Sequence, residues 1–143
     1  MKTAIHAAAG LVFAASGAGV HAQANKTPAF PMDRPMTMRA IEAVCTGISS
    51  DARNDPRWAS YPLKIEMVGA SGEFLGDAQV TLSKGDEAIA SINCGAPWVL
   101  FKLMPGAYSV SAEIEGVSKS AKVNVAVTGQ ARVILRFTDA AKR

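Results

Sequence analysis

Residues 108–115 alternate strictly between apolar and polar side chains, and this period restricts the possible folds more than any other feature of the chain. Every even position in this range is Tyr, Val, Ala or Ile, and every odd position is Ser or Glu. Successive side chains of a β-strand point to opposite faces, so the range predicts a strand with one buried and one solvated face. A similar alternation recurs in residues 63–67, 78–83, 121–127 and 133–137.

Two further segments are mainly apolar and are also expected to be strands. They are residues 88–92 and 98–103, and the second should be a strand buried on both sides or at the core edge. Gly, Asp and Pro residues separate the segments, as at 84–86, 104–106 and 115–116. About seven short strands with no helix between them are typical of an antiparallel β-sandwich.

Residues 37–58 are predicted to be helical. Thr37 can cap a short helix that Gly47 ends, because apolar residues then recur along one face. These residues are Met38, Ile41, Val44 and Cys45. A second helical turn is expected within 49–58, capped by Ser49 or Ser50 and limited by Pro56.

Trp58 lies at the end of this segment, and we expect it to pack against the sandwich rather than to form an exposed binding site. Trp98 and Phe101 are also interpreted as core residues, with a ligand-lining role as the alternative.

Residues 25–36 contain three prolines, at positions 28, 31 and 35. Proline lacks a backbone donor and favours extended geometry in its neighbour, so we interpret this range as a flexible or extended leader. A proline-rich ligand motif is the alternative, but no P-x-x-P repeat with a flanking basic pair is present.

Residues 1–24 have the composition of a cleavable secretory signal peptide. Lys2 gives a positive start, and residues 7–20 are uncharged, mostly apolar and too short to span a bilayer. Cleavage is expected after Ala22 or Ala24, which predicts a periplasmic or secreted protein without membrane insertion. A retained anchor helix is the alternative.

Cleavage would also remove both histidines, His6 and His21. The mature chain would then have no imidazole for a catalytic triad, for general base catalysis or for metal ligation. Loss of Lys2 lowers the net charge of +3 by one. A chain so close to neutrality has little electrostatic attraction for nucleic acid, so no nucleic-acid partner is expected.

Cys45 and Cys94 are the two cysteines of the chain, and an even number in an exported protein favours a disulfide. Closing this loop should stabilise the fold by up to about 4 kcal/mol. Two free thiols are the alternative, whereas redox catalysis is disfavoured because the spacing is not C-x-x-C.

Residues 103–112 read L-x-P-G-x-Y-x-V-x-A and follow the segment DAQVTL at 77–82. This pattern resembles the carboxypeptidase regulatory-like domains, and residues 47–53 and 95–98 are similar to a stand-alone exported bacterial subgroup. The resemblance implies a seven-stranded, antiparallel, Greek-key β-sandwich of prealbumin-like type with a short N-terminal helix. The sandwich domain would occupy residues 59–138, and residues 139–143 would form a tail.

The resemblance implies an accessory or binding module without catalytic activity, cofactor or metal. A hydroxyisourate hydrolase shares the transthyretin fold, but it relies on histidines and a Tyr-Arg-Gly-Ser tail, and this chain ends DAAKR. The expected partner is an unidentified protein or another component of the cell envelope, bound through edge strands whose backbone groups are unpaired.

Two other functions are considered. A histidine-free, carboxylate-dependent hydrolase would need paired acids, and Glu113 and Glu115 are expected to share a strand face, but a solvated one. A pilus-like or adhesin-like subunit would need a donated N-terminal strand, for which the proline-rich leader at 25–36 is poorly suited. The oligomeric state is left open.

Overall fold

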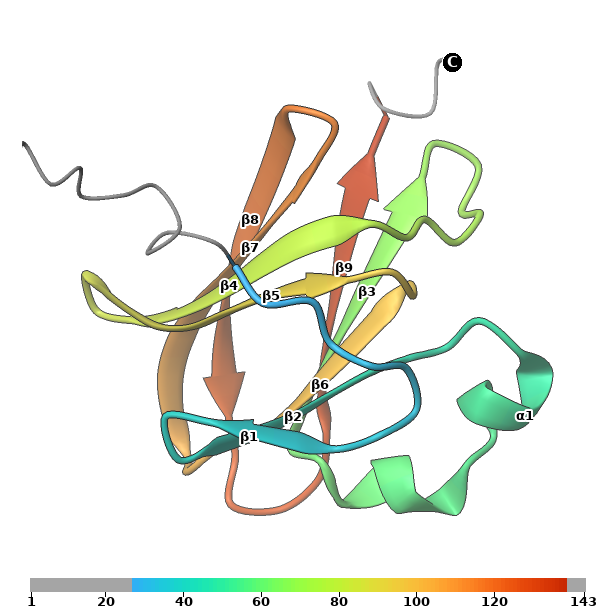
Figure 1. The fold of residues 1–143 in the computed structure, drawn as a ribbon. Helices are drawn as coiled ribbons and strands as arrows, with labels where there is room; N and C mark the ends of the chain where they lie inside the picture. The colour runs from blue at the N-terminus through green and yellow to red at the C-terminus, as the bar shows by residue number, and fades with distance from the viewer. Residues whose placement is uncertain (1–26, 139–143) are drawn as a thin grey trace, which may run out of the picture.

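The computed structural model describes residues 27–138, which form two facing β-sheets and two short helical segments (Figure 1). Residues 1–26 and 139–143, which include the predicted signal peptide and tail, lie outside the described range. One sheet has the strand order β1-β2-β6-β3-β9, and the other has the order β5-β4-β7-β8. The strands are β1 (Met36–Met38), β2 (Ile41–Thr46), β3 (Leu63–Gly69), β4 (Ala78–Lys84), β5 (Glu87–Cys94), β6 (Trp98–Lys102), β7 (Gly106–Ile114), β8 (Val117–Val125) and β9 (Ala131–Phe137).

The core lies between the two sheets and is built from the alternating residues of the predicted strands. In β7 the apolar positions 108, 110, 112 and 114 are buried, while Glu113 is exposed. The bulkiest fully buried side chains are Phe101, Phe137, Leu63, Ile65 and Met67. The seven predicted strands are therefore all present, and the expectation of an all-β sandwich is confirmed at this level.

The predicted helix over residues 37–47 is wrong, because this range forms the hairpin β1–β2. Arg39 and Ala40 make its two-residue turn, with φ angles of 50° and 65°. β2 is buried on both faces: Cys45 points into the main core and Val44 points into a second cluster. The segment therefore lacks the apolar–polar alternation of a half-buried strand, and the apolar positions of so short a run also match helical spacing.

This hairpin raises the number of strands among the described residues to nine. The prediction of a purely antiparallel sandwich is also wrong, because β3 and β9 pair in parallel from Leu63–Ala131 to Gly69–Phe137. The other strand pairs are antiparallel.

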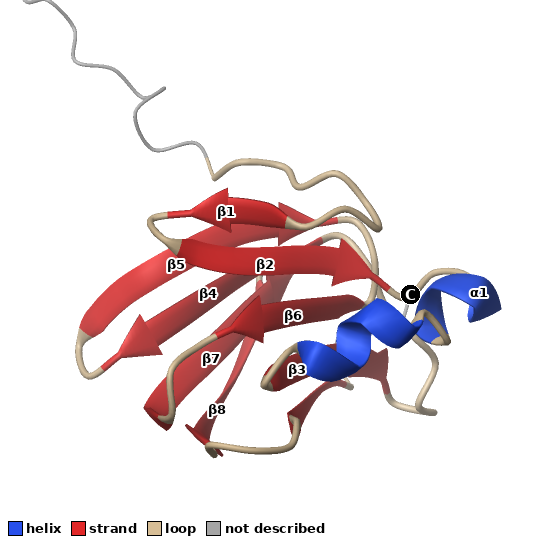
Figure 2. Ribbon diagram, turned by 90° about the horizontal axis from the view of Figure 1, so that it is seen from below, coloured by secondary structure: helices blue, strands red, loops and turns tan. Residues whose placement is uncertain are grey.

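The second predicted helical turn is confirmed. Helix α1 (Ser50–Arg53) is capped by the Ser49 side chain, which accepts a hydrogen bond from the Ala52 backbone N–H at 3.0 Å. A 3-10 helix, η2 (Pro56–Ser60), follows. Both lie beside the outer face of the five-stranded sheet (Figure 2). Trp58 is buried there as expected.

The leader is extended and pairs with both sheets. Ala29 bridges to Asn93 at the edge of β5, and Met32 bridges to Cys45 in β2. Backbone hydrogen bonds of 2.8 to 3.0 Å join Phe30 and Pro28 to Asn93. In Figure 1 this segment, drawn in blue, crosses from one sheet to the other. The described part of the leader therefore closes one side of the sandwich.

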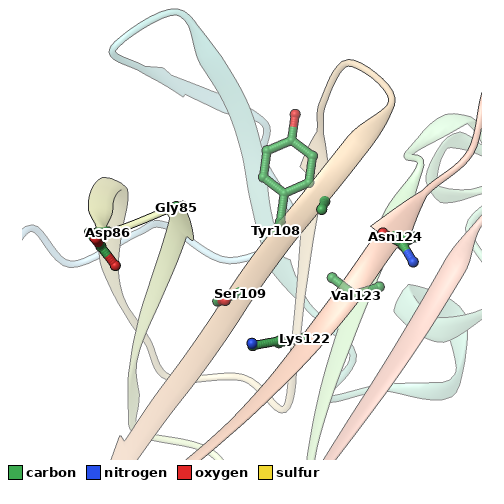
Figure 3. A pocket seen from close by; sticks show the side chains of 8 residues that line it. Gly85, Asp86, Tyr108, Ser109, Lys122, Val123 and Asn124 are labelled. Atoms are coloured by element: carbon green, nitrogen blue, oxygen red, sulfur yellow. The ribbon is translucent and has the colours of Figure 1, made fainter.

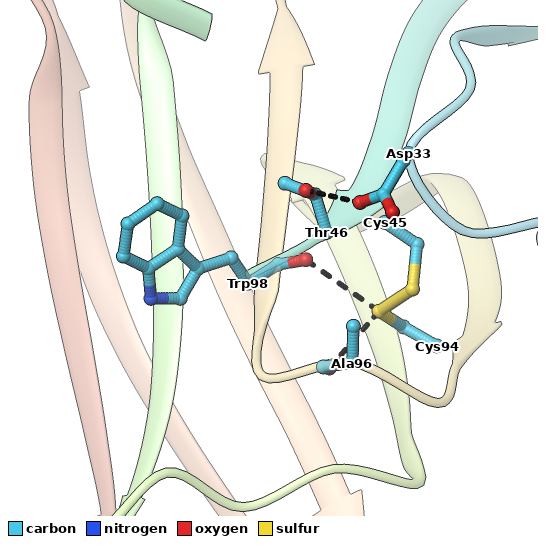
Figure 4. The surroundings of a disulfide bond; sticks show 6 residues. All are labelled: Asp33, Cys45, Thr46, Cys94, Ala96 and Trp98. Carbon is cyan, nitrogen blue, oxygen red and sulfur yellow. Dashed lines mark hydrogen bonds between the residues drawn. A yellow bond between two sulfur atoms is a disulfide. The ribbon is translucent and has the colours of Figure 1, made fainter. Parts of the chain in front are cut away.

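Cys45 and Cys94 form the predicted disulfide, with an S–S distance of 2.05 Å. The bond ties β2 of one sheet to β5 of the other, and both cysteines are buried (Figure 4). Beside it, the Thr46 hydroxyl donates a 2.6 Å hydrogen bond to Asp33 of the leader. The Sγ atom of Cys94 lies 3.1 Å from the Ala96 carbonyl oxygen, a contact without a donated proton because the sulfur is in a disulfide. The leader and both sheets thus meet at one point.

Across the described residues, we find no helix with the length and apolar character needed to cross a membrane.

Candidate binding surface

The outer face of the five-stranded sheet, together with α1 and η2, gathers charged and aromatic side chains into one connected surface. We call it the cationic–aromatic face. It comprises Glu42, Arg53, Asp55, Arg57, Trp58, Tyr61, Lys64, Glu66, Phe74, Trp98, Lys102 and Arg132.

The strand register explains why these residues meet. On the outer face Glu66 of β3 lies opposite Trp98 of β6, and Lys64 lies opposite Arg132 of β9. Lys64 therefore reaches Trp98 diagonally across one strand pair, and Arg132 reaches Glu66 diagonally across the other.

One series of contacts runs from helix α1 to β3. The Arg53 guanidinium lies 5.2 Å from the Phe74 ring centroid, and the Phe74 and Trp98 rings are 6.1 Å apart at 89°. The Lys64 ammonium lies 4.2 Å from the Trp98 ring centroid. These are distances at which cations and edge-to-face aromatic pairs attract one another. The two cations thus flank a pair of packed rings.

Gly47 makes room for the indole in this series. Its φ angle is +104°, and a Cβ atom there would lie 2.8 Å from Cγ of Trp98. Any side chain at this position would therefore displace Trp98, so the glycine fixes where the ring can lie.

Glu66 ends the series and is only 2% exposed. It accepts hydrogen bonds from Nε and Nη2 of Arg132, the second at 3.1 Å, and its carboxylate lies 3.3 Å from the Lys64 ammonium. Burial alone would raise the pKa of Glu66, but these cations outweigh it and hold the pKa below its usual range. The hydrogen bond that Arg132 donates to Glu66 raises the pKa of Arg132 in turn.

A second series runs along η2 and into β6. The Arg57 guanidinium lies 4.5 Å from the Trp58 ring centroid, and the Trp58 and Tyr61 rings are 5.9 Å apart at 71°. The Lys102 ammonium lies 5.0 Å from the Tyr61 ring centroid. Both series thus place cations against aromatic rings on the same side of the molecule.

Each end of the second series carries a carboxylate. The Tyr61 hydroxyl donates to Glu42, and this hydrogen bond, with Lys102 3.4 Å away, holds the pKa of Glu42 below its usual range. Burial and the Glu42 carboxylate raise the pKa of Tyr61. Asp55 accepts a 2.7 Å hydrogen bond from Nη2 of Arg57, and contacts with Arg57 lower the pKa of Asp55. All three carboxylates of the face are therefore kept ionised and paired.

A hollow of about 310 Å³ opens between the two series. Its wall includes Arg53, Lys64 and Trp98 of the first series and Trp58 of the second. The indole N–H of Trp58 donates to the Ala52 carbonyl at 2.8 Å, whereas that of Trp98 is buried without a partner among the described residues. Trp98 is thus buried, as expected for a core residue. It also lines a hollow, a position that the sequence analysis considered only as the alternative to core packing.

The electrostatic character of the face follows from its composition. Its cations outnumber its carboxylates, and the pKa values of six of its groups are shifted: Glu42, Asp55, Arg57, Tyr61, Glu66 and Arg132. Shifted pKa values gather at functional sites and in structural ion-pair networks alike. Rigid cations in excess favour binding of an anionic group.

The outer face of the four-stranded sheet is different in character. Ser91, Thr81, Ser111 and Ser120 lie in register across its four strands. At one end a shallow hollow of about 520 Å³ is lined by Asp86 of the β4–β5 turn and by Ser109, Lys122 and Asn124 (Figure 3). Figure 3 shows Lys122 extending toward the side on which Asp86 lies.

The two acids considered for the hydrolase hypothesis, Glu113 and Glu115, lie in β7 and in the turn that follows it. Glu113 is exposed, as expected, opposite Gln79 and Ser118. Glu115 does not continue the strand face, because β7 ends at Ile114 and Glu115 occupies the turn to β8 with a φ of 52°. The expectation that Glu113 and Glu115 share one strand face is therefore wrong. Within residues 27–138, no three His, Cys, Asp or Glu side chains are grouped closely enough to hold a metal ion.

The cationic–aromatic face was not predicted from the sequence. The alternation in residues 63–67 places Lys64 and Glu66 correctly on the outer side of their strand, but it does not show which residues they contact there. Two aromatic residues just before β3, Trp58 and Tyr61, were the one indication in the sequence, because they cover the outer face of the five-stranded sheet. Arg132 could not be connected with Glu66 without knowing that β3 and β9 are neighbours.

Comparison with models of known protein families gives no match for this chain. A search of curated proteins likewise finds no matching sequence.

Proposed function

We propose that this protein is a non-catalytic binding module that works outside the cytoplasm and recognises an acidic partner through its cationic–aromatic face. The observation that supports this most is the excess of cations held in fixed positions by aromatic rings and backbone carbonyls. Because these side chains are already ordered, binding would cost little additional conformational entropy.

The arrangement favours binding over catalysis. A catalytic acid needs a pKa near the working pH, whereas the pKa values of Glu42, Asp55 and Glu66 are all shifted downward, away from neutrality. Glu66 is also fully engaged by Arg132 and Lys64. These carboxylates therefore suit the positioning of cations better than proton transfer.

The proposed location depends on the disulfide and on the composition of residues 1–24. A buried disulfide between Cys45 and Cys94 is typical of a protein that folds in an oxidising compartment. The pairing of Ala29 with β5 of the same chain favours a closed module over a subunit that donates its N-terminal strand.

The test is capture of a partner from a cell-envelope extract by charge-matched variants. The face variant carries Arg57→Gln and Lys102→Gln, two exposed cations with side chains 57% and 46% accessible. The control carries Lys84→Gln and Lys122→Gln, which remove the same charge from the four-stranded sheet. We expect wild type and control to recover the same protein, the face variant to lose it, and recovery to fall with added salt. Equal recovery by all three proteins would refute the proposal.

A further inference from the structure

We infer that the outer edge of β9 binds an extended acidic segment of the partner as an added strand, an assignment that rests on the proposed binding function. On the side that faces the arginines of β9, this segment carries an acid, an apolar residue and a second acid. β9 contributes Arg132 to the cationic–aromatic face, so a strand added at this edge would lie directly beside that face.

The first argument is the row of unpaired backbone groups along β9. In Figure 1, β9 (red) lies beside β3 at the end of the five-stranded sheet. The Ala131 N–H donates to the Pro62 carbonyl at 2.8 Å, and the backbone groups of successive strand residues point to opposite sides. Those of Arg132, Ile134 and Arg136 therefore point away from β3, and they make no hydrogen bond within residues 27–138. Such a row can pair with an extended chain.

The second argument is the set of side chains on the same three residues. Arg132, Ile134 and Arg136 are exposed, while the residues between them are buried. Ile134 is 44% exposed, and the side chain of Arg132 is 58% exposed. Residues directly opposite one another in a strand pair place their side chains on the same face. An added strand would thus set its acids against the two arginines and its apolar residue against Ile134.

The third argument is that both guanidinium groups have donors to spare. Arg132 uses Nε and Nη2 for Glu66. Arg136 uses Nη1 for the carbonyls of Gly69 and Ala70. The remaining nitrogens of both side chains make no hydrogen bond in the described part of the chain. A carboxylate can therefore accept a charge-assisted hydrogen bond from either arginine without breaking the contacts that hold it in place.

The same charges disfavour a second copy of this chain as the added strand. Antiparallel pairing of two β9 strands about Ile134 would place Arg132 of each copy opposite Arg136 of the other. Like charges directly opposite one another destabilise a strand pair. Charge complementarity therefore favours an acidic segment of a different protein.

The experiment measures amide hydrogen exchange in β9 by nitrogen–proton correlation spectra of the full mature protein. The probe is the N-acetylated, C-amidated peptide TETVTET, and its neutral control is TQTVTQT. Without peptide, the N–H groups of Arg132, Ile134 and Arg136 should exchange faster than those of Val133 and Leu135, which are bonded to β3. TETVTET should slow exchange at the three edge residues at a lower concentration than TQTVTQT does. Equal effects of the two peptides, or no effect of either, would overturn the assignment.

Backbone methylation of the probe separates strand addition from simple charge attraction. In an antiparallel added strand, the valine N–H of TETVTET faces β9, whereas the N–H of the threonine before it faces solvent. In a parallel added strand the two N–H groups exchange roles. One of the two N-methylated peptides should therefore lose binding while the other keeps it. Equal affinities of these two peptides would rule out strand addition.

Variants check the named residues. Arg136→Gln should weaken the affinity for TETVTET about threefold, as expected for loss of one exposed ion pair. Lys122→Gln on β8, the edge strand of the other sheet, is the control and should leave the affinity unchanged. Ile134→Pro removes an N–H that points away from β3, so it should abolish binding. Equal affinity of Arg136→Gln and wild type would overturn the assignment even if Ile134→Pro fails to fold.

Failure of this strand site differs from failure of the proposed function. If no peptide binds but the Arg57 and Lys102 variant still loses its partner, only the strand site is wrong. If TETVTET protects the edge of β9 while wild type and every variant recover the same partner, the binding function assigned to the face is wrong.

Discussion

The hydroxyl of Tyr61 donates a hydrogen bond to the carboxylate of Glu42, which joins the residue that follows η2 to the edge-side strand β2. The two residues are 19 positions apart in the sequence. This contact fixes one end of the helical segment on the sheet, and Trp58 with its bond to Ala52 fixes the middle.

Tyr61→Phe tests this contact. At neutral pH the variant should lose about 1 kcal/mol of unfolding free energy, because one partly buried hydrogen bond disappears. Burial and Glu42 raise the pKa of Tyr61 in the folded state, so its neutral form stabilises the fold below the ordinary tyrosine pKa of about 10. That contribution declines as the pH rises further. Urea unfolding from pH 7 to 11 should therefore show a steeper alkaline loss in wild type than in Tyr61→Phe; parallel curves would contradict the prediction.

Glu66→Gln tests the buried ion pair. We expect a loss of about 1–3 kcal/mol at pH 7, because Arg132 and Lys64 lose a charged acceptor and an amide takes its place. The pKa of Glu66 is lowered in the folded state, so the ionised form stabilises the fold above the ordinary glutamate pKa of about 4.3. This contribution is lost as the pH falls below that value.

The measurement for Glu66 is urea unfolding at pH 7 and at pH 3. The difference between wild type and Glu66→Gln should shrink at pH 3. Glu113→Gln, at an exposed position on β7, is the control and should change stability by less than about 0.5 kcal/mol. A difference that stays constant with pH would show that the ion pair does not contribute as described.

Replacement of Cys45 and Cys94 by serine should cost about 2–4 kcal/mol of unfolding free energy. The disulfide spans 49 residues and links the two sheets, so its loss increases the entropy of the unfolded chain and leaves buried hydroxyls. Thermal unfolding of wild type with and without a reductant provides the matched comparison. Unchanged melting temperatures in both comparisons would contradict this role.

Gly76→Ala should be more destabilising than Gly72→Ala. A Cβ atom at Gly76 would lie 2.2 Å from the Gly95 carbonyl oxygen, which is backbone and cannot turn aside. We expect a loss of at least about 2 kcal/mol from this overlap. Gly72 has open space around it and only a φ of +84° to accommodate, so alanine there should cost about 1 kcal/mol. Chemical denaturation of both variants gives the ranking, and the reverse order would refute this interpretation.

The sandwich strands were predictable because their side chains obey a simple period. Residues 108–114 show this best, since each apolar position points into the core and each polar one points out. The hairpin β1–β2 was not predictable, because β2 lacks the alternation of a half-buried strand and the spacing of its apolar residues fits a helix as well. The pairing of the leader with β5 was also not predicted. It depends on backbone hydrogen bonds of residues such as Phe30, and backbone groups are the same in every sequence position except proline.

The candidate site was predictable only in part. Burial of Trp58 followed from its position beside an element boundary, and the disulfide followed from the cysteine count. The connection of Glu66 with Arg132 depends on a parallel strand pair that joins residues 66 positions apart. No local pattern in the sequence indicates which two strands become neighbours.

The parallel pairing of β3 with β9 also sets the order in which the molecule can be completed. β3 is the first strand of the sandwich after the helical segment, while β9 is the last strand of the described chain. When the polypeptide is made from its N-terminus, β3 has one free edge until β9 has arrived. A nascent chain would therefore leave the backbone groups along that edge of β3 unpaired until β9 is added.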